Sequence, residues 1–115
     1  MMRKMLKAKI HGATVTETIL HYEGSISVDR ELMDRVDLLP GEMVLVVNVN
    51  NGARLETYVI EAPRGSGTIC LNGPAARMAE DGDIVHVLSF CYVDDEAARG
   101  LRERVVHVDP ENRPI

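Results

Sequence analysis

The polar residues that could do chemistry in this chain stand in short groups between apolar stretches. They are Lys9 and His11, Tyr22 to Ser25, Arg54, Thr57 and Tyr58, and Asn72 with Gly73. Lysine and arginine side chains hold carboxylates, lysine as a point charge and arginine as a bidentate fork. A serine hydroxyl can act as a nucleophile, and a tyrosine hydroxyl can transfer a proton. Each residue also has a structural reading: Lys9 as a charge at a strand edge, Tyr58 as a half-buried strand aromatic, and Ser25 as a turn residue.

The common catalytic and metal-binding motifs are missing. The four histidines do not share metal-ligand spacing on one element, and the two cysteines are not paired with them, so no metal site is expected. The run Arg64-Gly65-Ser66-Gly67 lacks the Lys-Ser/Thr pair and long helix of a phosphate-binding loop, which favours an ordinary turn. The pair Asp94-Asp95 begins a predicted helix and is interpreted as a cap rather than a carboxylate dyad.

The elements that position these residues are predicted to be mainly short strands. The chain has 115 residues, enough for one domain, and its apolar fraction of 45% is normal for a globular domain. Valine and isoleucine are frequent and aromatic residues are scarce, which favours β structure around an aliphatic core. Strands are predicted at residues 4–10, 13–18, 26–28, 43–49, 54–62, 68–71, 83–93 and 104–108.

Short helices and turns separate these strands. Asp29 is a candidate N-cap for a helix over residues 30–36, and Pro74 suits the first position of a helix over residues 74–78. Acidic residues favour a further helix start at Asp94, with its end at Gly100. Asn50-Asn51-Gly52 predicts a hairpin turn. Since no strand–helix–strand spacing recurs, the pattern predicts a mainly β protein, a small closed barrel of six to eight strands.

Charge and composition also bear on partners and location. The net charge of −5 argues against a general nucleic-acid binder, and no apolar run approaches the length that a membrane span needs. The basic N-terminal stretch has no following apolar region, so no secretory signal is expected. Cys70 and Cys91 both lie in apolar runs, which fits the reducing cytoplasm.

Several motifs, in order along nearly the whole chain, resemble those of the bacterial aspartate 1-decarboxylases. They are Lys9 and His11, His21-Tyr22-Glu23-Gly24-Ser25, Asn51-Gly52, Arg54, Thr57-Tyr58, Arg64-Gly65-Ser66, Asn72-Gly73, Ala75-Ala76, Gly82-Asp83-Ile84-Val85, and Asp95-Glu96-Ala97-Ala98-Arg99. One such fragment would be weak evidence, whereas all of them at matching spacing are strong. Position 74 departs from the family's usual string, because proline stands where alanine is expected and removes one backbone N–H.

The resemblance implies a double-psi β-barrel, a homotetramer with sites at subunit boundaries, and a covalent cofactor made from the chain itself. Family members are inactive precursors that cut one Gly–Ser bond, which here is Gly24–Ser25. Cleavage gives a small chain, residues 1–24, and a larger chain, residues 25–115, headed by a pyruvoyl group from Ser25. The second Gly–Ser bond, Gly65–Ser66, is expected to stay intact.

The same resemblance implies the reaction and the roles of the site residues. The pyruvoyl ketone forms a Schiff base with L-aspartate, without pyridoxal phosphate or a metal, and decarboxylation gives β-alanine for pantothenate and coenzyme A synthesis. The implied roles are aspartate binding by Lys9 and Arg54, contact of Thr57 with the Gly24 carbonyl, and proton donation by Tyr58. Asn72 is expected near the pyruvoyl group, Gly73, Ala75 and Ala76 along the pocket, and Tyr22 and His11 in its wall.

Two alternatives remain open from the sequence. A small barrel that only binds a partner would explain the strands, but would leave Lys9, Arg54, Thr57, Tyr58 and the Gly24–Ser25 turn as coincidences. The other alternative is a family member that no longer cleaves itself or needs a maturation protein to do so.

Overall fold

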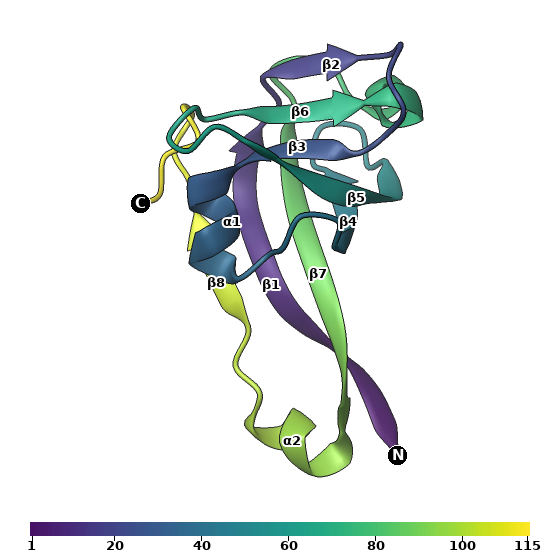
Figure 1. Cartoon of the computed structure of the whole chain (residues 1–115), viewed down its shortest axis with the longest axis vertical. Helices are drawn as coiled ribbons and strands as arrows, with labels where there is room; N and C mark the ends of the chain where they lie inside the picture. The colour runs from purple at the N-terminus through teal and green to yellow at the C-terminus, as the bar shows by residue number, and fades with distance from the viewer.

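The computed structural model describes all residues from 1 to 115, and most of the predicted strands are present in it (Figure 1). None of its helices has the length and apolar character that crossing a membrane requires. The elements are β1 (Met2–Thr14), β2 (Glu17–Ile19), β3 (Ile26–Asp29), α1 (Arg30–Val36), β4 (Met43–Asn48), β5 (Arg54–Ala62), β6 (Ile69–Asn72), the 3₁₀-helix η1 (Gly73–Met78), β7 (Ile84–Asp94), α2 (Asp95–Gly100) and β8 (Arg104–His107).

The strands form one strongly curved sheet in the order β2-β6-β3-β5-β4-β7-β1-β8. Only Val15 and Thr16 separate β1 from β2 in the chain, yet these strands lie near opposite ends of that order. The sheet must therefore curl back on itself. Thr16 fixes the return, because its backbone N–H and its hydroxyl both donate to the carbonyl oxygen of Ile69, at 2.8 and 3.0 Å. The predicted small β-barrel with short helices is confirmed.

The interior of the barrel is aliphatic, as the composition predicts. Alternate residues of each strand point inward: on β4, Val44 and Val46 are buried, while Met43 faces outward and is 64% exposed. The main cluster of 21 buried residues contains only alanine, valine, leucine, isoleucine and methionine. Aliphatic side chains offer a substrate neither charge nor hydrogen bonds, so the polar candidate residues must act outside this cluster.

One strand prediction is wrong. The predicted separate strands at residues 4–10 and 13–18 are instead one long strand, β1, followed by a break at Val15 and the short β2. The pairing of β1 with β7 continues through two register shifts, one between Leu6 and Ala8 and one between Ile10 and Ala13. Gly12 lies in the second and has φ of +80°, a conformation that glycine adopts without strain. The local pattern shows the interruption but not that pairing continues through it.

The outer parts of β1 and β7 extend beyond the other strands as a two-stranded arm that ends at α2 (Figure 1). Arg3 on this arm pairs with Asp95 of α2 at 2.6 Å. The predicted start of α2 is confirmed, because the Asp94 carboxylate accepts a hydrogen bond from the Ala97 N–H. Phe90 and Tyr92 on the arm are 37% and 69% exposed.

The predicted cap at Asp29 is confirmed and has a second role. Its carboxylate accepts hydrogen bonds from the Glu31 N–H at 2.8 Å and from the Gly65 and Gly67 N–H groups at 2.9 Å. Asp29 is only 2% exposed, so these three N–H donors take the place of the water molecules that would hydrate an exposed carboxylate. The residue therefore fixes both the start of α1 and the loop between β5 and β6.

We predict that Asp29→Ala lowers the free energy of unfolding by about 3 kcal/mol, because a helix cap and two charge-assisted hydrogen bonds are lost. The matched control is Asp34→Ala on the same helix, whose carboxylate forms exposed ion pairs with Arg30 and Arg64. We expect this control to cost about 1 kcal/mol or less. Urea unfolding at one fixed protein concentration measures both, and equal losses would contradict the role given to Asp29.

Candidate active site

Ser25 lies in a buried and strained segment at the start of β3. It is 1% exposed, and its φ of +100° is rare for a residue with a side chain. The preceding Gly24 has φ of +134°. Such a backbone persists only where the surrounding structure holds it in place. The Gly24–Ser25 bond is therefore unlike the second Gly–Ser bond, whose Ser66 is exposed and has no such conformation.

Gly73 packs directly against this segment. A side-chain carbon at position 73 would lie 2.8 Å from the Gly24 backbone nitrogen and 2.8 Å from the Tyr22 carbonyl oxygen. These distances exclude any larger residue without a shift of the backbone. Gly73, predicted along the pocket, therefore meets the segment from Tyr22 to Gly24 through backbone contact.

Asn72 holds Ser25 through its side chain and its backbone. The Asn72 amide nitrogen Nδ2 donates to Ser25 Oγ and to Ser27 Oγ, both at 2.9 Å. The Asn72 backbone N–H donates to the Ser25 carbonyl oxygen at 3.0 Å. On the other side, the Cys70 thiol donates to Asn72 Oδ1 at 3.2 Å. Burial raises the pKa of Cys70 to about 11, so this thiol stays protonated at neutral pH.

A cavity of about 570 Å³ opens beside Ser25 and brings together half of the predicted site. The pairing of β3 with β5 explains why these residues meet. The two strands are parallel and Ile26 lies opposite Val59, so the preceding residues Ser25 and Tyr58 lie side by side. Pro74, the departure from the family's usual string, lies at the start of η1 as predicted and also lines the cavity. The predicted residues in its wall are Gly24, Ser25, Thr57, Tyr58, Asn72 and Ala75.

The remaining predicted residues do not line this cavity. Gly73 and Ala76 flank the lining residues Pro74 and Ala75 on η1, and Tyr22 is 52% exposed on the segment after β2. Lys9 lies on β1, which β7 and β4 separate from β5. Arg54 begins β5 and does not line the cavity, but it lies next to its edge, because the following residues Leu55 and Glu56 do line it.

Lys9 and Arg54 share the outer face of the sheet with a row of histidines. Arg54 pairs with Val47, which in turn pairs with His86 on β7. The His86 ring stacks on His11, with ring centroids 4.1 Å apart, and His11 lies 4.8 Å from the His107 ring. The row therefore crosses five strands, from β8 to β5, on the face opposite the core. No group of three His, Cys, Asp or Glu side chains in the chain is arranged to hold a metal ion.

Sequence reasoning missed His86 and Cys70 as neighbours of the site residues. His86 was considered only for metal-ligand spacing, although its place between buried Val85 and Val87 predicts an outward side chain. The Gly12 N–H donates to His86 Nδ1 at 3.0 Å, which places the proton of the neutral ring on Nε2. Burial lowers the pKa of His86, and His11 and Lys9 lower it further. Burial also lowers the pKa of His11, with smaller effects from Lys9 and His107.

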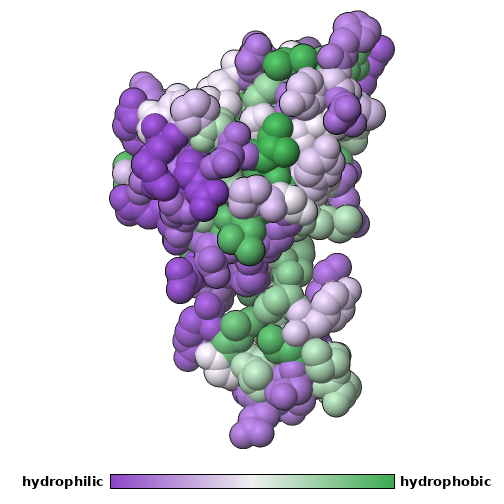
Figure 2. All heavy atoms as spheres, in the orientation of Figure 1, coloured by the Kyte–Doolittle hydropathy of each residue, from purple (hydrophilic) through white to green (hydrophobic).

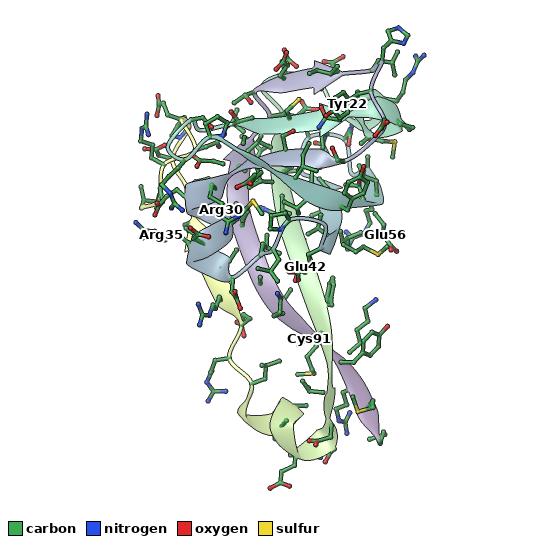
Figure 3. The ribbon with its side chains drawn as sticks, viewed as in Figure 1. Tyr22, Arg30, Arg35, Glu42, Glu56 and Cys91 are labelled. Carbon is green, nitrogen blue, oxygen red and sulfur yellow. The ribbon has the colours of Figure 1, made fainter.

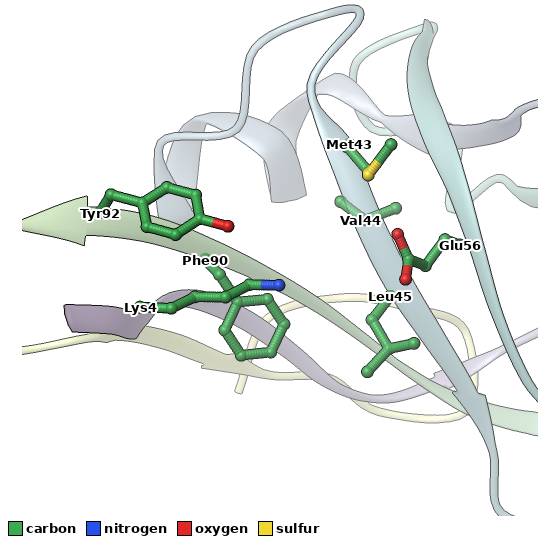
Figure 4. Close-up of a pocket in the computed structure, with 7 residues that line it drawn as sticks. All are labelled: Lys4, Met43, Val44, Leu45, Glu56, Phe90 and Tyr92. Carbon is green, nitrogen blue, oxygen red and sulfur yellow. The ribbon is translucent and has the colours of Figure 1, made fainter. Parts of the chain in front are cut away.

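A second hollow of about 400 Å³ lies between the arm and β4 (Figure 4). Its lining is mostly apolar and consists of Lys4, Met43, Val44, Leu45, Glu56, Phe90 and Tyr92. The Lys4 ammonium lies 5.3 Å from the centre of the Phe90 ring, a cation–π contact. The hollow shares Met43 and Glu56 with the Ser25 cavity, so the two form neighbouring parts of one surface.

We predict that the melting temperature falls as the pH is lowered from 7.5 to 5.5, in part because of His86. Its pKa is lower in the folded than in the unfolded chain, so its stabilisation is complete above about pH 6.5 and is lost as pH falls. His86→Gln keeps an acceptor for the Gly12 N–H and removes this titration. Its melting temperature should fall a few degrees less. The matched control is His21→Gln, at an exposed histidine. If the melting temperature of His86→Gln falls as much as that of the wild type, the assignment to His86 is wrong.

Comparison with known proteins identifies the family. Residues 1–115, the whole chain, match the aspartate decarboxylase family. The chain is 51% identical over 115 residues to the aspartate 1-decarboxylase of Thermoanaerobacter pseudethanolicus, covering 100% of this chain and 98% of that protein. It is 58% identical over 111 residues to the enzyme of that name from Pelotomaculum thermopropionicum, covering 96% and 84%. It is 58% identical over 113 residues to that from Syntrophus aciditrophicus, covering 98% and 97%. The chain therefore belongs to the aspartate decarboxylase family.

Proposed function

We propose that this chain cuts its own Gly24–Ser25 bond and uses the pyruvoyl group formed at position 25 to decarboxylate L-aspartate. The products are β-alanine, a precursor of pantothenate and coenzyme A, and carbon dioxide. Family membership over the whole chain supports the reaction. The observation that carries the proposal is the buried Ser25, which has a strained backbone with φ of +100° and accepts a hydrogen bond from Asn72.

The first step is an acyl shift within the chain. Ser25 Oγ attacks the Gly24 carbonyl carbon, the C–N bond breaks, and the nitrogen takes the hydroxyl proton, so the amide becomes an ester with a free amine. Gly24 favours this step because it has no side-chain carbon to obstruct the attack. The intermediate carries an oxyanion, for which a fixed donor is needed. We assign that donor role to Thr57, which lines the same cavity.

The second step breaks the Ser25 Cβ–Oγ bond. A base removes the Ser25 α-proton, Gly24 leaves as a carboxylate, and position 25 becomes dehydroalanine. One water molecule is then consumed as the nitrogen leaves as ammonia, and a ketone remains. The residues around position 25 fit this product, since the Asn72 amide points a donor there and Gly73 leaves no room for a competing side chain.

In turnover, the pyruvoyl ketone would supply an electron sink, as pyridoxal phosphate does in other decarboxylases. The chain's own residues would do the remaining work. Lys9 and Arg54 would bind the two substrate carboxylates, and Tyr58, whose side chain is 40% exposed at the cavity, would hold the proton for the product carbon. His11 and Tyr22 would complete the wall.

We further propose that Lys9 and Arg54 reach the Ser25 cavity of a neighbouring copy in a homotetramer. In one chain neither cation lines the cavity, since Lys9 lies on β1, beyond β4 and β7, and Arg54 lies at the cavity edge next to Leu55. The outer face of the sheet also exposes Met43, Phe90 and Tyr92, and apolar residues lie at the surface of the arm in Figure 2. Contiguous exposed apolar surface favours contact with a partner. The tetramer would act in the cytoplasm, and two free cysteines fit a reducing compartment.

We predict that the purified precursor, when warmed, separates on a denaturing gel into chains of residues 1–24 and 25–115. Intact mass should show that the larger chain lacks a free α-amine and reacts with carbonyl reagents. Ser25→Ala should stay whole and inactive, while Ser66→Ala, at the exposed second Gly–Ser bond, should be cut like wild type. A wild-type chain that stays whole alone and is cut only with cell extract would mean that a maturation protein is required. A chain whole under both conditions would refute the proposal.

A subunit-mixing experiment tests the shared site. Ser25→Ala lacks the ketone and Arg54→Ala lacks a substrate ligand, so we expect each alone to be inactive, although Arg54→Ala is still cut. Co-expressed in equal amounts, the two should regain about a quarter of wild-type activity, because random assembly pairs an intact Ser25 with an intact Arg54 at one site in four. If each site belongs to one chain, the mixture should remain inactive.

A further inference from the structure

We propose that Cys70 is a positioning residue for self-cleavage, because its thiol sets which end of the Asn72 side-chain amide faces Ser25. This inference rests on the proposed function. The pairing of β3 with β6 builds the arrangement, since Ser27 lies opposite Cys70 and Ile26 lies opposite Leu71. Ser25 and Ser27 on one strand therefore meet Cys70 and Asn72 on the other, on a single face of the sheet.

The contacts form a chain of donors that runs from Cys70 to Ser25. The thiol donates to Asn72 Oδ1 at 3.2 Å, and Asn72 Nδ2 donates to the hydroxyl oxygens of Ser25 and Ser27 at 2.9 Å. Cys70 and Asn72 are 3% and 2% exposed, so water does not compete for these groups. Every buried side-chain polar atom of the protein has a partner.

Of these partners, only the thiol determines the direction of the amide. An asparagine amide has a donor end and an acceptor end of nearly the same shape. Serine hydroxyls can donate or accept, so Ser25 and Ser27 would tolerate either orientation of Asn72. A protonated thiol acts as a donor, and it therefore favours the orientation that turns Oδ1 toward Cys70 and the NH₂ group toward Ser25.

This orientation matters when the ester breaks. As the Cβ–Oγ bond opens, Oγ leaves with the Gly24 carboxylate and gains negative charge. The NH₂ group of Asn72, already 2.9 Å from Oγ, stabilises that charge. A reversed amide would place a carbonyl oxygen there and would oppose it. Loss of the Cys70 donor should therefore slow elimination more than the acyl shift, and the ester should accumulate.

The test compares a variant that keeps a donor with one that does not. Cys70→Ser retains a donor for Asn72 Oδ1, although a hydroxyl also accepts and so fixes the amide direction less strictly, and it should form the 25–115 pyruvoyl chain within about threefold of the wild-type rate. Cys70→Ala should be about tenfold slower, the scale of one lost buried hydrogen bond. Hydroxylamine cuts an ester but not the amide, so in Cys70→Ala it should release a 25–115 chain that begins with serine, recognised by its mass. Cys91 lies on β7 in the arm, well below Tyr22 in Figure 3, and does not line the cavity, so Cys91→Ala should behave like wild type.

Thermal melting and circular dichroism establish that each variant folds. If alanine at position 70 disrupts the core, Cys70→Thr and Cys70→Val make the same comparison, because threonine and valine have the same shape and only threonine has a donor. Equal cleavage rates in donor and non-donor variants, or slow cleavage without trapped ester, would overturn the role of Cys70. If the wild-type chain itself is never cut, the proposed function fails and this role falls with it. If wild type is cut and the Cys70 variants match it, self-cleavage stands and only the role of Cys70 is overturned.

Discussion

The pairing of β3 with β6 is the constraint on which the candidate site depends. It sets the Asn72 amide and backbone N–H against Ser25, which lies 47 residues away in the chain. A positive φ at a non-glycine residue costs on the order of 1–3 kcal/mol, and a free loop would relax it. Here β3 is held on both sides, parallel to β5 and antiparallel to β6. The barrel thus fixes the backbone and hydroxyl of Ser25, the group that attacks the Gly24 carbonyl in the proposed function.

A few buried polar side chains hold the loops around these strands in place. Packing of aliphatic side chains is not directional, whereas hydrogen bonds are. The positions of the loops therefore depend on hydrogen bonds from buried polar side chains. Asn112 joins the C-terminal segment to Thr14 and Gly67 through three hydrogen bonds, and Asp29 joins α1 to the loop at Gly65. Because buried polar groups are costly when unpaired, each such residue allows only a narrow set of loop positions. These contacts fix Gly67, two residues before the start of β6, the strand that ends at Asn72.

Local patterns predicted the elements well and their contacts poorly. The caps at Asp29 and Asp94 and the hairpin after β4 were found because their signals lie within a few residues. The continuity of β1 through its irregularities was not, since pairing with β7 decides it. Alternation also shows which face a side chain takes but not which strand lies beside it. The assignment of Lys9 and Arg54 to the substrate comes from the family resemblance, and within one chain neither residue lines the Ser25 cavity.

That separation has a consequence for maturation. Ser25, Asn72 and Thr57, the groups assigned to cleavage, belong to one chain and lie at one cavity or in its wall. The cations assigned to substrate binding lie on the outer face with exposed apolar residues. In the proposed function, cleavage therefore needs only a folded barrel, whereas turnover needs a second copy to complete the site. Since the core is filled, closure between copies is the available way to exclude water from the ketone while leaving a path for aspartate.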